Sequence, residues 1–115
     1  MRKEKLAPWL RIMRLQFYPL SFVAYSLGTA MAGAKGLGFT LNTYLLGYAY
    51  LFLLELCAVL SNELWDLPMD RINRNASPFN GGSRVLVEGR LKPAEVQAFL
   101  SGALCLLVGS CFWLL

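Results

Sequence analysis

Residues 41–62 read LNTYLLGYAYLFLLELCAVLSN, an apolar run in which Glu55 is the only charge. A helix over this run, at about 1.5 Å per residue, is about 33 Å long and matches the thickness of a bilayer's hydrocarbon core. Uncharged runs at 15–34 and 96–115 flank it. The pattern predicts an all-α, polytopic membrane protein with three transmembrane helices, at about 15–34, 41–62 and 94–115.

The composition agrees with this prediction. Of the 115 residues, 57% are hydrophobic and 16% charged, and the mean hydropathy is +0.48. Soluble domains average about 25% charged residues. The chain has no His, and its three cysteines all fall in apolar runs, so a zinc site and a disulfide framework are both excluded. Cys57, Cys105 and Cys111 are expected to be buried free thiols.

The basic residues alternate along the chain. Five of them precede the first apolar run, five lie between the second and third, and Lys35 alone lies between the first and second. By the positive-inside rule, the N-terminus and the 63–92 loop are cytoplasmic in an integral membrane protein of the cell or inner membrane. A nucleic-acid partner is not expected. A cleaved signal peptide is disfavoured because the 15–34 run exceeds the usual apolar region of about 7–15 residues.

The stretch from Asn62 to Asp70, NELWDLPMD, carries the first chemical signal. Asn62, Asp66 and Asp70 are spaced i, i+4, i+8, which on a helix aligns their oxygens along one face over about 12 Å. Oxygen ligands at the mouth of a helix bundle suit Mg²⁺, which proteins hold with one or two carboxylates plus substrate phosphates. Pro68 is expected to kink or end the helix between the two aspartates.

A polar stripe precedes this motif on the same helix. Tyr44, Tyr48 and Glu55 lie close to the face that carries Asn62. A carboxyl group inside a membrane is costly and usually faces a cavity or a partner helix. The stripe therefore predicts a polar cavity, while a protonated Glu55 hydrogen-bonded to a neighbouring helix stays an equal alternative.

The loop that follows is basic and contains a flexible turn, FNGGSR, at 79–84. Such a turn can direct backbone N–H groups at an anion, and an arginine adds bidentate phosphate binding. We expect diphosphate contacts here, from Arg71, Arg74, Ser83 and Arg84. The alternative is that these arginines face lipid headgroups.

Two segments resemble a known family. NELWDLPMDRINR at 62–74 is similar to the first aspartate-rich signature of the UbiA-type intramembrane aromatic prenyltransferases. GGSRVLVEGRLKPAE at 81–95 is similar to the loop of the branch that contains the dihydroxynaphthoate polyprenyltransferases of menaquinone synthesis. The resemblance implies a bundle of about nine helices. It also implies Mg²⁺-dependent transfer of a prenyl group from a polyprenyl diphosphate to an aromatic quinone precursor.

The resemblance further implies that Asn62, Asp66 and Asp70 are the catalytic Mg²⁺ ligands. The family needs a second aspartate-rich motif on a later helix, and this chain has no Asp after Asp70. We therefore expect residues 1–115 to be the N-terminal part of a transferase, inactive until the remaining helices complete the site. The alternative is a non-catalytic three-helix membrane protein that oligomerises and binds anionic lipid. A phosphatidyl-transferring enzyme is disfavoured, because its Asp-Gly and Ala-Arg pattern is absent.

Overall fold

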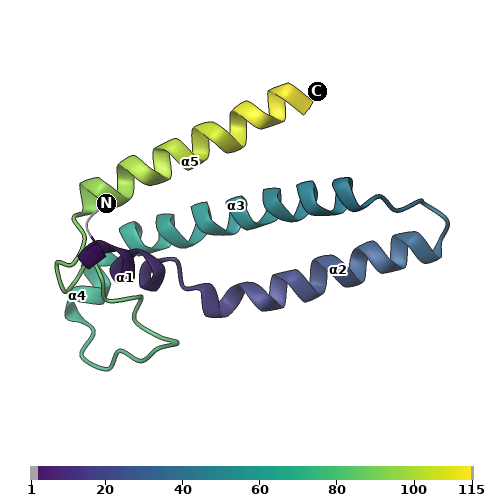
Figure 1. The fold of residues 1–115 in the computed structure, drawn as a ribbon. Helices are drawn as coiled ribbons and strands as arrows, with labels where there is room; N and C mark the ends of the chain where they lie inside the picture. Colours follow the sequence, from purple (N-terminus) through teal and green to yellow (C-terminus); the bar gives the residue numbers. More distant parts are fainter. Residues whose placement is uncertain (1–2, 115) are drawn as a thin grey trace.

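The computed structural model describes residues 3–114 and is built of helices, with no β-strand in that range. Three long helices lie lengthwise, and the short elements gather at one end (Figure 1). The elements in chain order are α1 Lys3–Ile12, the 3-10 helix η1 Leu15–Phe17, α2 Tyr18–Ala34, α3 Leu41–Trp65, α4 Leu67–Ile72 and α5 Pro93–Leu114. The all-α prediction is confirmed.

Helices α2 and α3 form an antiparallel hairpin (Figure 1). The turn between them, residues 35–40, reverses the chain at Gly36 and Gly38, whose φ angles of 78° and 64° suit glycine. Thr40 then caps α3, because its hydroxyl oxygen accepts a hydrogen bond from the backbone N–H of Thr43 at 3.2 Å. The short turn thus makes α2 and α3 antiparallel neighbours.

Helix α5 runs beside α3 at the end where the short elements gather and diverges from it toward the C-terminus (Figure 1). The hydrophobic core lies at the end where the two helices are close. Its fully buried side chains come from α1, α3, α5 and the loop before α5: Ile12, Leu60, Val85, Leu91 and Val96. The residues after α4 are therefore part of the packed structure.

The basic N-terminal segment forms a helix that the apolar pattern did not predict. In α1 the Trp9 ring packs against Phe99 of α5, with ring centroids 5.0 Å apart. Lys5 forms an ion pair with Glu95, also on α5. These two contacts hold α1 against the start of α5.

The predicted helix over 15–34 is divided. Residues Leu15–Phe17 form the 3-10 turn, and the α-helix begins at Tyr18, with Pro19 in its first turn. Proline lacks a backbone N–H and disfavours helical conformation in the residue before it, so it begins helices more readily than it continues them. The α-helical part is consequently 17 residues long.

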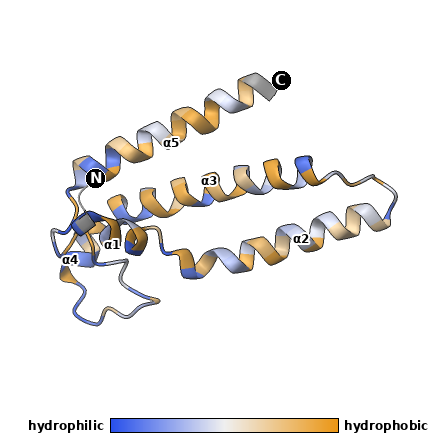
Figure 2. Ribbon diagram, viewed as in Figure 1, coloured by the Kyte–Doolittle hydropathy of each residue, from blue (hydrophilic) through white to orange (hydrophobic). Residues whose placement is uncertain are grey.

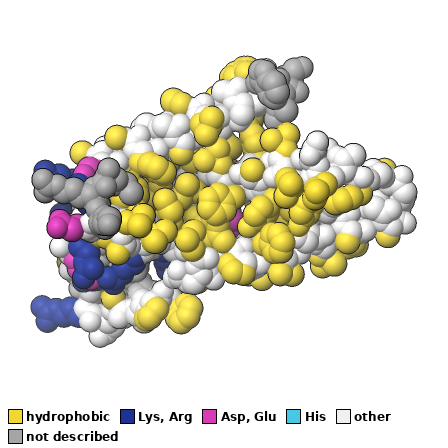
Figure 3. All heavy atoms as spheres, viewed as in Figure 1, with side chains coloured by type: hydrophobic (Ala, Val, Ile, Leu, Met, Phe, Trp, Pro, Cys, Tyr) yellow, Lys and Arg dark blue, Asp and Glu magenta, His cyan; other side chains and the backbone are white. Residues whose placement is uncertain are grey.

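Two of the described helices are long and apolar enough to cross a membrane, α3 and, in α5, the segment Pro93–Phe112. Only 17% of the apolar window of α3 and 22% of that of α5 are buried. Figure 2 shows hydrophobic residues along the long helices, and Figure 3 shows charged side chains gathered at the end that carries α1 and α4.

The predicted cytoplasmic loop over 63–92 is only partly a loop. Helix α3 continues to Trp65, and α4 follows after a one-residue break at Asp66. Pro68 lies in the first turn of α4, so a helix does end close to this proline, but the break falls at Asp66 and not between Asp66 and Asp70. Of the cysteines, Cys57 is buried as expected, whereas Cys105 and Cys111 are exposed.

Candidate functional site

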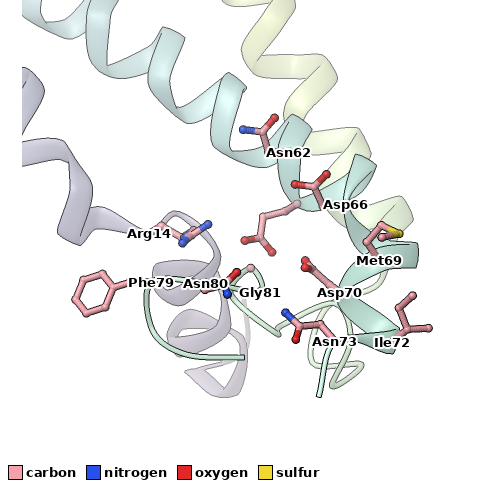
Figure 4. Close-up of a pocket in the computed structure, with 12 residues that line it drawn as sticks. Arg14, Asn62, Asp66, Met69, Asp70, Ile72, Asn73, Phe79, Asn80 and Gly81 are labelled. Carbon is pink, nitrogen blue, oxygen red and sulfur yellow. The ribbon is translucent and has the colours of Figure 1, made fainter. Parts of the chain in front are cut away.

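A cleft of about 560 Å³ opens where α3 ends and α4 begins. We call it the carboxylate cleft because Glu63, Asp66 and Asp70 line it together with Asn62. Arg14 and the turn Phe79–Gly82 lie across from these residues (Figure 4). The structure thus brings all three predicted metal ligands to one cleft.

The backbone around Pro68 keeps these ligands in register. The N–H of Asp66 donates to the carbonyl of Asn62, and the N–H of Asp70 donates to the carbonyl of Asp66, each at 2.8 Å. These bonds continue the helical spacing across the break, so the three side chains follow one another by single turns. Asp70 therefore lies on a helix, although Pro68 precedes it by only two residues.

Glu63 is a cleft residue that the spacing argument missed. Its side chain is 4% exposed and holds the loop after α4, because Ser83 donates to it twice: from the backbone N–H to Oε1 and from the hydroxyl to Oε2, both at 2.7 Å. Glu63, Asp66 and Asp70 are spaced i, i+3, i+7, which also defines one helical face. A search for a third carboxylate on that face would have found it.

Gly82 brings the loop backbone against the acidic residues. Its φ is 71°, and a Cβ at this position would collide with Oδ2 of Asp70 and lie 3.5 Å from Oε1 of Glu63. Only glycine combines that φ with so close an approach. The predicted flexible glycine turn is thus one wall of the carboxylate cleft.

The four residues that the sequence predicts to contact a diphosphate do not lie together in the structure. Ser83 lies buried against Glu63, at 6% exposure. Arg84 donates from Nη1 to the carbonyls of Asp70 and Asn73 and lines a second cleft. Arg71 and Arg74 are exposed and line neither cleft.

Arg14 is the second cleft residue that sequence reasoning missed. In the sequence it is one of the five basic residues before the first apolar run, yet it lines both clefts and lies over the Phe17 ring, with 4.8 Å from its guanidinium carbon to the ring centroid. The sequence feature that could have indicated a place at the cleft is that Arg14 directly precedes the first apolar run. Arg14 is thus the cation of the carboxylate cleft.

The donor chemistry of the carboxylate cleft fits Mg²⁺. Asn62 and Asp66 are exposed to it, and oxygen is the ligand atom that this ion prefers. Among residues 3–114, no three His, Cys, Asp or Glu side chains lie close enough to hold a metal ion by themselves.

The stripe of Tyr44, Tyr48 and Glu55 lies at the contact between α2 and α3. Tyr44 and Ser26 share a hydrogen bond of 2.6 Å, and the Tyr48 ring packs edge-on against Phe22. Ser21 donates to Oε1 of Glu55, while the buried Oε2 has no hydrogen-bond partner among the described residues. Glu55 thus makes the helix-to-helix hydrogen bond that the sequence left as one of two possibilities.

Comparison with known proteins gives no further guide to this site. No protein family, no curated protein and no solved structure matches the chain.

Proposed function

We propose that this chain is the N-terminal part of an intramembrane prenyltransferase of the UbiA type, which transfers a prenyl group from an isoprenoid diphosphate to an aromatic quinone precursor. The observation that carries the proposal is the carboxylate cleft. It gathers Asn62, Asp66 and Asp70 with Arg14 at the polar end of apolar helices.

A membrane setting supports the proposal. The core helices of a soluble protein are mostly buried, whereas only 17% of the apolar window of α3 and 22% of that of α5 are buried. Exposed apolar area on this scale needs lipid or further helices to cover it. In the proposed arrangement α2, α3 and α5 all span the bilayer, and the remaining helices of the transferase pack beside them.

The cleft residues have distinct proposed roles. Asn62, Asp66 and Asp70 hold Mg²⁺, which when bound supplies Lewis-acid stabilisation of the charge on the departing diphosphate. Arg14 faces the diphosphate as a charge-assisted donor. Glu63 is a positioning residue, because its bonds to Ser83 hold the glycine wall of the cleft in place.

The polar stripe of α3 has a proposed role further into the membrane. In the proposed reaction the allylic C–O bond breaks and its electron pair leaves with the diphosphate. A ring carbon of the aromatic acceptor then attacks the allylic cation and loses its proton to solvent. Tyr44 and Tyr48 of α3 are the proposed partners of this cation, since an aromatic ring stabilises a nearby cation by about 0.5–2 kcal/mol. Glu55 lies on the same stripe, where Ser21 of α2 donates a hydrogen bond to it.

A binding experiment tests the proposal on the 115-residue chain. In lipid nanodiscs we expect geranylgeranyl diphosphate to bind in the presence of Mg²⁺ and to be released by EDTA. Asp66→Asn keeps the shape but removes the charge, and should weaken binding about tenfold or more, because charge-assisted contacts contribute about 1.5–3 kcal/mol.

Glu4→Gln is the matched control, since it removes one exposed carboxylate that lies outside both the carboxylate cleft and the cleft lined by Arg84. Binding should be unchanged in this variant. If the wild type and Asp66→Asn bound geranylgeranyl diphosphate with equal affinity, the assignment of Asp66 as a Mg²⁺ ligand would be wrong. No Mg²⁺-dependent binding in any variant would contradict the proposed function as a whole.

A further inference from the structure

The second cleft, of about 380 Å³, lies on the other side of the Gly82 wall. We call it the arginine cleft because three arginines line it and no carboxylate does. Its lining residues are Arg11, Arg14, Gln16, Ala76, Ser77, Pro78, Gly82, Ser83 and Arg84. Two clefts of opposite charge thus share the wall at Gly82 and the side chain of Arg14.

The arginines of this cleft are held by protein contacts that leave donors available. Arg84 uses Nη1 for the carbonyls of Asp70 and Asn73. Arg11 makes one long ion pair, 3.4 Å from Nη1 to Glu88. The guanidinium of Arg14 has neither a hydrogen-bond nor an ion-pair partner among the described residues and lies over the Phe17 ring. A planar guanidinium carries five N–H donors, so most of these donors remain free.

Neutral donors complete the lining. The Ser77 oxygen accepts hydrogen bonds from the backbone N–H groups of Phe79 and Asn80, at 3.3 and 3.1 Å, so its own proton is left to donate. Gln16 adds an exposed amide. Three positive charges and neutral donors repel a metal ion and attract an anion. The volume equals about a dozen water molecules at about 30 Å³ each, enough for a phosphate with an attached group.

We propose that the arginine cleft is a phosphate-binding site that works without a metal ion. Its ligand is a phosphate group, and guanidinium forks match the oxygens of such a group in pairs. The cleft adjoins η1 and the start of α2, at the charged end of the apolar helices, where phospholipid headgroups and soluble phosphates are both within reach. This site is separate from the carboxylate cleft and does not rest on the proposed transferase activity.

Two probes distinguish the sources of the phosphate group. Sodium pyrophosphate, titrated with EDTA present into the 115-residue chain in phosphatidylcholine nanodiscs, tests a soluble ligand by calorimetry. Retention of phosphatidylglycerol from an equal mixture with phosphatidylcholine, followed by native mass spectrometry, tests a headgroup. Binding of either probe supports the site and identifies its source.

Variants connect the binding to this cleft. Arg11→Gln removes a donor that lines only the arginine cleft, and Gln16→Glu adds a negative charge to it; both side chains are exposed, so folding is preserved. Each should weaken the affinity for the bound probe about tenfold. Lys92→Gln removes a positive charge outside both clefts and should change nothing.

Three results would overturn the proposal. The first is that neither probe binds. The second is that binding requires Mg²⁺, which would place the phosphate in the carboxylate cleft. The third is that Arg11→Gln and Gln16→Glu bind as tightly as Lys92→Gln. Failure of the transferase proposal leaves all three tests intact, because none of them measures prenyl transfer.

Discussion

Single residues decide the shape of the carboxylate cleft through backbone approach. Gly82 and Gly89 both have positive φ angles, 71° and 67°, but only Gly82 faces other groups. A Cβ on Gly82 would strike the Asp70 carboxylate, whereas a Cβ on Gly89 meets nothing within 4 Å. An alanine at Gly89 therefore costs backbone strain alone, whereas an alanine at Gly82 costs the same strain and also a steric collision with Asp70.

We predict that Gly89→Ala lowers the free energy of unfolding by about 1–2 kcal/mol, the cost of a left-handed alanine. Gly82→Ala should cost about 1–3 kcal/mol more, because the added methyl must also displace Asp70. Unfolding in mixed micelles with increasing sodium dodecyl sulfate measures both. Equal losses in the two variants would mean that the loop does not approach Asp70 as described.

At the scale of the helices, one small residue determines how closely α2 and α3 pack. A Cβ on Gly47 of α3 would collide with the Tyr25 hydroxyl of α2, which donates to the Tyr44 carbonyl at 3.0 Å. A Cβ on Gly28 of α2 would meet nothing within 4 Å. The hairpin thus depends on a glycine at one position and not at the other.

We predict that Gly47→Ala destabilises the hairpin by about 1–3 kcal/mol through overpacking. Gly28→Ala should instead stabilise α2 by about 0.5–1 kcal/mol, because alanine loses less backbone entropy in a helix. The same micelle titration, followed by circular dichroism, compares them. If the Gly47→Ala variant were as stable as the Gly28→Ala variant, the described packing of Tyr25 against α3 would be wrong.

Part of this helix-scale arrangement was predictable. The antiparallel hairpin follows from two apolar runs joined by a short glycine turn, and the break between α3 and α4 follows from Pro68. Helix α1 was not predictable from apolar length, because it is short and is held by Trp9 and Lys5 against a helix about ninety residues later in the chain.

At the scale of the whole molecule, the charged side chains gather at one end of the long helices (Figure 3). The turn with Lys35 lies at the opposite end of the α2 and α3 hairpin (Figure 1). If α2, α3 and α5 all span the bilayer, the two ends lie on opposite faces of it. The positive-inside rule then assigns the charged end to the cytoplasm.

Cysteine labelling tests this topology. In a chain with Cys57, Cys105 and Cys111 replaced by alanine, a single cysteine at Lys35 should react with an impermeant maleimide added outside intact cells. Cysteines at Glu4 and Arg90 should react only after the membrane is opened. Labelling of Glu4→Cys from outside would show that α2 does not cross, and labelling of Arg90→Cys from outside would contradict the cytoplasmic loop.

Local spacing was enough to predict the long helices and to align Asn62, Asp66 and Asp70, because both depend on the period and length of a continuous segment. It was not enough for Glu63 and Ser83, which are twenty residues apart and meet only when the loop folds back onto α3. The same fold turns Arg84 into the arginine cleft and brings Arg14 between the two clefts. Contacts between distant segments follow the path of the loop, and no periodic pattern encodes that path.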